Sequence, residues 1–228
     1  RRINLSWEKL IILLSEKIRA LKIRKRTSRI VLVLNSALTN EELFLMRRLF
    51  LEELAVSRFI FCDPPEEKGD NFLLTAERVP NRRGAEKIGF DLKSREEVLQ
   101  EDKIDLLLIF AAHLAEKMPL NWLSSLASEI GAKFLFSSQE SKLSQLMDFV
   151  APVTPVAEKA GSFINVDGLM QSFEAALNPW GESRPEWEIL VNLAREIPVN
   201  YRYFGRFNSP RAIWKAIAEE KLNISERL

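Results

Sequence analysis

The sequence has 228 residues, of which 46% are hydrophobic, so it can bury a sizeable core in one large or two small domains. Its 33 Lys and Arg nearly balance 32 Asp and Glu, which argues against a dedicated nucleic-acid-binding protein because such proteins usually carry a strong basic excess. The single Cys62 and single His113 exclude a disulfide framework, a cysteine-ligated zinc or iron–sulfur site and a multi-histidine metal site within this chain.

The first segment predicts a helix over residues 7–22, with Ser6 as its N-cap and apolar residues at helical spacing. A basic cluster follows, made of Arg19, Lys22, Arg24, Lys25, Arg26 and Arg29. We interpret it as a helix C-terminus and a solvated connector; a nucleic-acid or lipid-headgroup patch is the alternative. No run approaches the roughly 18 uninterrupted apolar residues of a membrane helix. Because the chain starts at Arg1 and not at Met, we expect a processed or trimmed protein or a fragment of a longer one.

Residues 29–152 predict strands that alternate with helices. Apolar runs indicate strands at 30–34, 59–62, 104–110 and 133–136. Capping boxes at 39–42 and 94–97 start two helices, the first through about Leu54, and a third helix near 119–130 is expected to end at Gly131 as a left-handed C-cap. The alternation predicts an α/β fold with a doubly wound, mostly parallel sheet and helices on both faces.

Beyond residue 152 the alternation fades. Residues 156–182 contain three glycines and predict turns and a small hairpin, residues 183–186 predict a helix start, and Ser209-Pro210 begins a last helix. We therefore expect an N-terminal helix with a basic connector (1–28), an α/β domain (29–152) and a C-terminal extension (153–228) that packs on it.

The strand-to-helix turns at 35–39, 111–114 and 137–139 contain no glycine, which argues against the common dinucleotide and triphosphate sites. His113 follows a predicted strand, and we interpret it as a histidine at a sheet edge that bonds to backbone or water, with a general base as the alternative. Cys62 is expected to be a buried, inert thiol, and Asp148 a cap or turn residue before a strand.

Residues 148–171 carry a more specific pattern. It resembles the molybdopterin-oxidoreductase sequence A-D-x-V-L-P, E-K-x-G-T-F-x-N, G-R-x-Q. The matching positions are Asp148, Val150, Pro152, Glu158, Lys159, Gly161, Phe163, Asn165, Gly168 and Gln171. Residues 4–10, 38–42, 80–85 and 179–187 resemble that family's S-W-D-E-A, T-N-E-E, P-N-x-x-G-A and G-E-A-R-P-D-W segments, in the same order.

Within that superfamily the chain is most similar to the C-terminal region of the large iron–sulfur subunit in the peripheral arm of respiratory complex I, the NADH:quinone oxidoreductase. The 80–85 loop and the chain end soon after 207–210 carry this likeness. It implies a cofactor-free structural module that supports electron transfer by neighbouring iron–sulfur domains. Its partners would be other peripheral-arm subunits and the iron–sulfur domain of the same subunit, with iron–sulfur clusters and FMN elsewhere in the complex. It would lie on the cytoplasmic side of the inner membrane, attached only through the complex, and would bind no nucleic acid.

Departures from the family pattern argue against a cofactor in this chain. Residues 111–113 replace the family's G-x-N-P turn, and Leu169 replaces the arginine of G-R-x-Q. Ser162 and Ala151 replace the threonine of G-T-F and the leucine of V-L-P. We therefore expect no catalytic, cofactor-binding or metal-ligating residue here. The family-like Glu158, Gly161, Asn165, Gly168 and Gln171 would preserve a turn structure, with both glycines at strained backbone positions.

Two alternatives stay open from the sequence. The chain could be a fragment of a molybdenum or tungsten oxidoreductase that retains part of a molybdopterin-guanine-dinucleotide site. It could also be an independent nucleotide-sensing domain, which would have to bind nucleotide despite its glycine-free turns.

Overall fold

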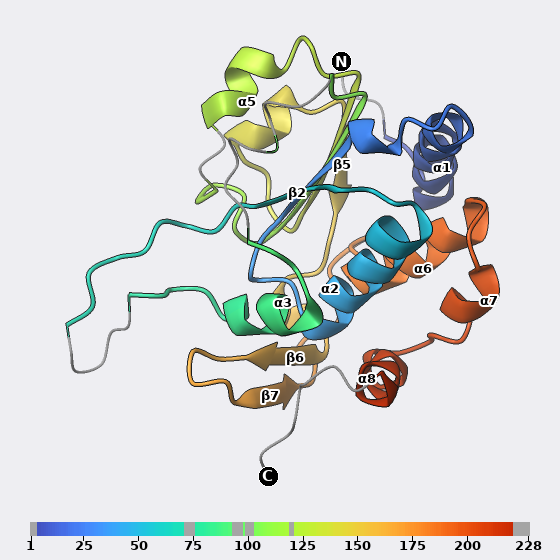
Figure 1. Cartoon of the computed structure of the whole chain (residues 1–228). Coiled ribbons are helices and arrows are strands. Elements are labelled where there is room, and N and C mark those ends of the chain that lie inside the picture. Colours follow the sequence, from blue (N-terminus) through green and yellow to red (C-terminus); the bar gives the residue numbers. More distant parts are fainter. Residues whose placement is uncertain (1–3, 71–75, 93–97, 99–102, 119–120, 221–228) are drawn as a thin grey trace.

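The computed structural model describes residues 4–70, 76–92, 98, 103–118 and 121–220. Its centre is a five-stranded, fully parallel sheet in the order β2-β1-β3-β4-β5 (Figure 1). The strands are β1 (Ile30–Leu34), β2 (Arg58–Phe61), β3 (Leu106–Ala112), β4 (Ala132–Ser137) and β5 (Phe149–Pro152). Chain order reverses between β1 and β3, as in a doubly wound sheet, so the predicted α/β class is confirmed.

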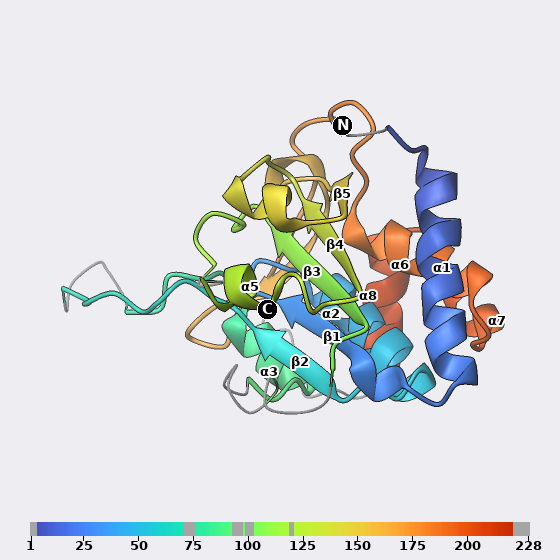
Figure 2. The ribbon, with the colours of Figure 1, turned by 90° about the horizontal axis from the view of Figure 1, so that it is seen from above.

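Helices cover both faces of this sheet (Figure 2). One face packs against α1 (Trp7–Ile23), α2 (Asn40–Met46), α6 (Glu186–Glu196) and α8 (Pro210–Glu219), and the other against α5 (Asn121–Leu126) and η3 (Lys142–Leu146). Alternate residues of each strand enter the two cores, so Leu32 and Leu108 lie in one and Val31 and Leu107 in the other. Burial on both faces explains why the strands are continuous apolar runs.

The predicted caps of the first helices are present. The Ser6 side chain accepts from the Lys9 backbone N–H at the start of α1. Thr39 and Glu42 form the reciprocal capping box at the start of α2, with distances of 3.2 and 2.9 Å. The helix then continues as a π-helix, η2 (Arg47–Glu53), whose Leu49 and Phe50 are buried.

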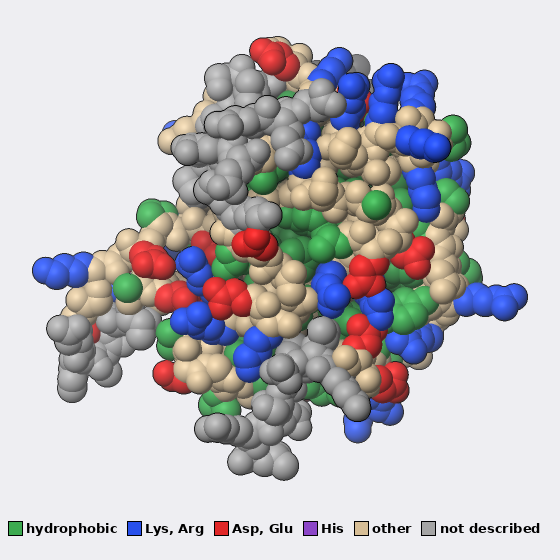
Figure 3. All heavy atoms as spheres, in the orientation of Figure 1, with side chains coloured by type: hydrophobic (Ala, Val, Ile, Leu, Met, Phe, Trp, Pro, Cys, Tyr) green, Lys and Arg blue, Asp and Glu red, His purple; other side chains and the backbone are tan. Residues whose placement is uncertain are grey.

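Lys and Arg side chains gather where α1 ends and η1 (Thr27–Arg29) follows (Figure 3). Several of them have partners within the chain. The Lys22 ammonium donates to the carbonyl oxygens of Glu53 and Pro198, and Arg29 pairs with Asp105 at 3.5 Å. These contacts fit the interpretation of the cluster as a helix terminus and connector.

Several predicted boundaries differ from the structure. The strand expected at 104–110 begins at Leu106 and runs to Ala112, and the helix expected at 119–130 is described only as α5. Gly131 is not a left-handed C-cap: its N–H donates to the Ile104 carbonyl, and an added Cβ would meet the Asp105 oxygen at 2.6 Å. The capping box predicted at 94–97 lies outside the described residues.

The last third of the chain contains the expected hairpin and helices. A 3-10 turn, η4 (Val156–Glu158), leads into β6 (Gly161–Ile164), which pairs antiparallel with β7 (Met170–Phe173). The helices α3 (Arg82–Ile88) and α7 (Tyr201–Phe204) complete the fold. The helix start predicted at 183–186 is present, with Pro185 at the N-cap position of α6, and Ser209 caps α8. Within the described ranges, no helix is both long and apolar enough to cross a membrane.

Candidate functional site

A buried cluster of three ionisable side chains joins the sheet domain to the C-terminal segment. The Lys159 ammonium donates to both oxygens of Glu42, at 2.8 and 3.0 Å, and to Oε2 of Glu186, at 2.8 Å. Glu42 and Glu186 lie in the first turns of α2 and α6, where carboxylates are favoured by the helix dipole. All three side chains are shielded from solvent, so the contacts are charge-assisted hydrogen bonds in a low-dielectric interior.

The charges of this Glu42–Lys159–Glu186 cluster balance only if one carboxyl group is protonated. Burial and the neighbouring Glu42 raise the pKa of Glu186 to about 8. Burial also acts to raise the pKa of Glu42, but attraction to the Lys159 ammonium outweighs it and lowers that pKa. At neutral pH the cluster therefore holds ionised Glu42, charged Lys159 and protonated Glu186, and is neutral as a whole.

A second polar set, beside the cluster, fixes β6 to α2. The Ser162 backbone N–H and hydroxyl donate to the two carboxyl oxygens of Glu41, at 2.9 and 3.0 Å, and the Asn40 amide donates to the Ser162 hydroxyl at 3.0 Å. Burial raises the pKa of Glu41 to about 7. Asn81 extends this set, because its side chain donates to the Leu38 carbonyl and accepts from the Ile164 N–H.

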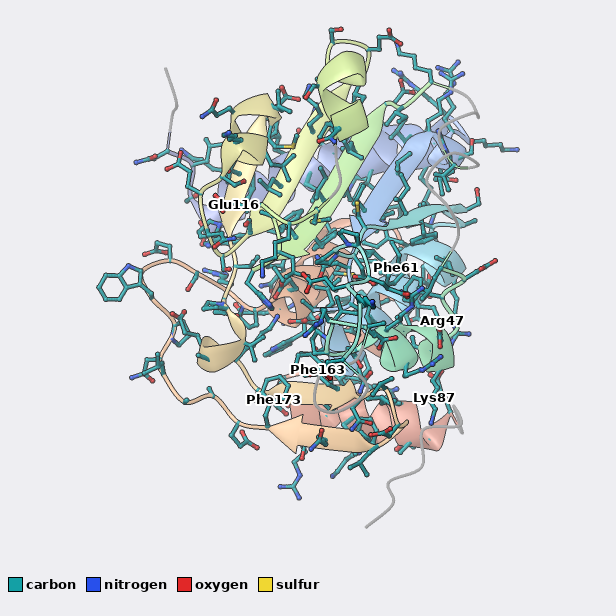
Figure 4. The ribbon with its side chains drawn as sticks, turned by 90° about the vertical axis from the view of Figure 1, so that its left-hand side faces the viewer. Arg47, Phe61, Lys87, Glu116, Phe163 and Phe173 are labelled. Atoms are coloured by element: carbon teal, nitrogen blue, oxygen red, sulfur yellow. The ribbon has the colours of Figure 1, made fainter. Side chains whose placement is uncertain are left out.

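The hairpin approaches α2 closely at Gly161. A Cβ built on this residue would lie 2.6 Å from the Thr39 methyl group, so no larger residue fits without movement. Gly161 does not have a positive φ, so the prediction of a strained backbone is wrong here and close packing is the reason for the glycine. Outside this contact the hairpin carries two neighbouring aromatic side chains: the Phe163 and Phe173 rings lie side by side, with their centroids 4.9 Å apart and their planes tilted by 39° (Figure 4).

The other family-like residues lie in turns or on the hairpin surface. Gly168 has φ +79° in the β6–β7 turn, where a strained position was predicted, and Asn165 Oδ1 accepts from the Asp167 and Leu169 N–H groups. A Glu158 oxygen accepts from the Trp180 N–H at 2.9 Å. Gln171 is exposed and pairs with Phe163 in the ladder. These contacts are all within the chain.

At the carboxyl ends of the strands, the described polar groups bind one another. The Ser36 backbone N–H and hydroxyl donate to the Asp63 carboxylate, at 2.7 and 2.6 Å, just after β1. The buried Asn35 amide donates to the Phe110 carbonyl at 2.9 Å. The β3 end carries Ala112 in a left-handed conformation, with φ +46°. This is the crevice at which doubly wound sheets commonly bind ligands.

The remaining candidates lie apart from one another. His113 is half-buried after the central strand β3, not at an edge strand, and its carbonyl accepts from the Gln139 amide. Burial and the Lys159 charge lower the pKa of His113, and its described contacts include no carboxylate that would orient it as a base. Cys62 is buried, as expected. Asp148 accepts from the Lys133 N–H and pairs with the Lys133 ammonium at 3.1 Å.

The central ion cluster was not predicted from the sequence. The prediction that Glu42 belongs to a capping box is correct, but its pairing with Lys159 and Glu186 was not predicted. The available signal was that all three residues lie within the family-like segments 38–42, 148–171 and 179–187. Nothing in their spacing along the chain indicates that these segments meet.

Comparison with known proteins supports the resemblance at the level of the superfamily. Residues 137–196 match the family profile described as Molybdopterin oxidoreductase. A nitrate reductase of Symbiobacterium thermophilum is 26% identical over 139 residues, which is 60% of this chain and 18% of that protein. A putative formate dehydrogenase of Staphylococcus haemolyticus is 38% identical over 56 residues (25% of this chain, 6% of that protein). A probable oxidoreductase of Bacillus subtilis is 32% identical over 63 residues (28% and 6%).

The similarity therefore covers between 6% and 18% of the length of these relatives. The profile match contains Lys159, Ser162 and Glu186, whereas Glu42 and Asn81 lie outside it. The predicted likeness to molybdopterin oxidoreductases is confirmed for residues 137–196. The narrower likeness to a complex I subunit stays a prediction.

Proposed function

We propose that this chain is a structural α/β module of a larger oxidoreductase of the molybdopterin type and contributes no catalytic residue to it. The observation that carries the proposal is the buried Glu42–Lys159–Glu186 cluster. Residues from three family-like segments are used there for internal ion pairing, out of reach of any substrate. The cluster holds the sheet, the hairpin and α6 in one arrangement, which is the role of a scaffold.

The crevice at the strand ends does not fit a pterin dinucleotide. Phosphate binding at such a crevice needs free backbone N–H groups and room beside them. Here the Ser36 N–H is occupied by the Asp63 carboxylate, which would also repel a phosphate group. At the end of β3, Ala112 places a Cβ where a glycine would leave space. These two features support a module that leaves this crevice without a dinucleotide.

A narrower form of the proposal places the module in the peripheral arm of complex I. Its support is the 80–85 loop, whose Asn81 holds the hairpin to the body of the protein. Under this proposal the module lies on the cytoplasmic side of the inner membrane and contacts iron–sulfur and flavin-bearing parts of the assembly. None of the relatives named above is a complex I subunit.

The rival is a fragment of a molybdenum or tungsten oxidoreductase that keeps part of a pterin-guanine-dinucleotide site. The names of the relatives favour this rival, since they are a nitrate reductase and a putative formate dehydrogenase. The Asp63 carboxylate at the end of β1 and Ala112 at the end of β3 favour a module without cofactor.

One purification distinguishes these proposals. The tagged full chain is purified from its native cells in mild detergent, and the eluate is analysed by peptide mass spectrometry, metal analysis and oxidised-pterin fluorescence. A scaffold is supported if the chain is recovered with a larger oxidoreductase and if the chain, once separated from its partners, contains neither pterin nor metal. Flavin and cysteine-rich subunits in that eluate support complex I. Stoichiometric pterin retained by the isolated chain overturns the proposal in favour of the rival.

A further inference from the structure

The edge strand β5 is only partly paired on its outer side. It pairs with β4 on one side, and within the described residues its other side meets only a single bridge, between Val153 and Arg184. The Thr154 N–H donates to the Arg184 carbonyl, and the Arg184 N–H donates to the Pro152 carbonyl. The segment around Arg184 thus begins a further parallel strand position beside the end of β5 and leaves Phe149–Ala151 uncovered.

An open groove of about 1360 Å³ runs along this uncovered edge. Its walls come from the start of α1, from β5, from the segment after β4 and from residues 182 and 184. Apolar side chains lie exposed in it, with Val150 41% and Leu5 46% accessible. The Trp7 indole N–H donates to the Glu182 carbonyl at 2.6 Å, which fixes the two sides of the groove relative to each other.

The groove is acidic. Its lining includes the carboxylates of Glu8, Glu140, Asp148 and Glu182 and the guanidinium of Arg184. Arg184 pairs with Glu188 at 3.3 Å and Asp148 pairs with Lys133 at 3.1 Å, so the charges of both are offset by residues outside the groove. Glu8 and Glu182 are exposed to solvent. A ligand here meets an excess of negative charge above an apolar floor, which selects against nucleic acid and against anionic cofactors.

We propose that this groove binds an extended polypeptide segment with alternating basic and apolar side chains, which adds a strand to the sheet beside β5. The backbone of such a segment pairs with the N–H and carbonyl of Val150, which face the same side as the Pro152 and Thr154 groups that bond to Arg184, whereas Phe149 and Ala151 face β4. Its apolar side chains cover Val150 and Leu5, and its basic side chains face Glu8 and Glu182. The strand position begun by Arg184 sets the parallel direction of the added segment.

The test uses the full chain and three synthetic peptides as probes. Acetyl-KVKVKV-amide carries the proposed pattern, and acetyl-EVEVEV-amide reverses its charge. Acetyl-KPKPKP-amide keeps the charge but lacks the backbone N–H of every second residue, which disfavours a strand. Binding is measured by calorimetry and located by hydrogen exchange. We expect acetyl-KVKVKV-amide to bind best and to protect the outward-facing Val150 amide.

Matched double variants separate the groove from general surface charge. Replacing the two groove acids, Glu8→Lys with Glu182→Lys, should weaken binding by about tenfold or more. The control, Glu116→Lys with Glu174→Lys, changes net charge equally at exposed acids outside the groove and should leave binding unchanged. Equal binding of the proline peptide, equal losses in both variants, or protection elsewhere would overturn the proposal. The proposal would also be overturned if analytical ultracentrifugation found a dimer without any peptide and hydrogen exchange showed that this dimer protects the β5 edge.

Discussion

At the scale of single residues, the protonated Glu186 makes stability depend on pH. Its ordinary pKa is 4.5 and burial raises it to about 8, so between these values the folded state binds a proton that the unfolded state has released. The contribution of Glu186 to stability therefore falls as pH rises, by about 1.4 kcal/mol per pH unit for one proton. Glu41 adds a similar decline, but only up to its pKa of about 7.

We expect Glu186→Gln to remove the part of this decline that Glu186 causes. Denaturant unfolding is measured from pH 5 to pH 8 in the parent chain, in Glu186→Gln and in the control Glu188→Gln, whose carboxylate is half-exposed. His113 titrates in all three proteins, so differences between the curves isolate the substituted group. The difference between Glu186→Gln and the parent should grow in favour of the variant towards pH 8. Parallel curves would show that Glu186 is ionised in the folded protein.

Lys159 is expected to be the most costly single lysine to replace. Lys159→Met leaves two buried carboxyl groups without their cation, and breaking a buried ion pair in this way costs about 3–5 kcal/mol. The control Lys117→Met changes an exposed lysine and should alter the free energy of unfolding by no more than about 0.5 kcal/mol. Urea unfolding at pH 7 measures both, and similar small effects would contradict a structural role for the cluster.

At the scale of elements, the hairpin is held to α2 by close packing. Gly161→Ala forces a methyl group against Thr39 and should destabilise the fold by about 1–3 kcal/mol through overpacking. Gly168→Ala is the matched comparison, since its added methyl group meets open space and only the positive φ is unfavourable. We expect the midpoint of thermal unfolding to be lower for Gly161→Ala than for Gly168→Ala. The reverse order would mean that the hairpin can move away from α2 at little cost.

The elements themselves were largely predictable from the sequence. A strand covered on both faces must be apolar throughout, so runs such as 30–34 and 133–136 can be recognised as strands from the sequence. The capping box of α2 is equally local, because both of its hydrogen bonds join residues three apart. Gly131 was misassigned because its requirement comes from Asp105, a residue distant in sequence. The π-helical continuation of α2 has no local signature of this kind.

The candidate site was predictable only in part, for the same reason. Single segments identified Glu42 as a capping residue and placed Lys159 in a family-like pattern. Their meeting depends on how α2, η4 and α6 pack, which local patterns do not encode. The resemblance supplied the order of the segments but not their contacts.

At the scale of the whole molecule, the C-terminal extension and the α/β domain share one core. Ile30 and Leu108 of the sheet lie in the same apolar cluster as Leu190 of α6 and Ile213 of α8. The predicted boundary at residue 152 therefore separates sequence segments that bury each other's apolar surface. Such parts lose stability together when either unfolds.

We accordingly expect residues 29–152 and 153–228 to unfold in one transition. Far-UV circular dichroism reports the helices of both segments. Tryptophan fluorescence of the double variant Trp7→Phe with Trp122→Phe reports Trp180, Trp187 and Trp214, which all lie in the later segment. The two denaturation curves should coincide at pH 7. Different midpoints for the two denaturation curves would show that the C-terminal extension is an independent domain that unfolds separately from the sheet.

Asp63 gives the molecule a built-in competitor at the end of β1. The fold holds its carboxylate against the Ser36 amide and hydroxyl, as a tethered ligand whose effective concentration is on the order of millimolar or higher. A phosphate group arriving from solution must displace this resident anion against charge repulsion. At a position where doubly wound sheets commonly bind a soluble molecule, the chain supplies a carboxylate of its own, which ties the end of β1 to the loop that follows β2.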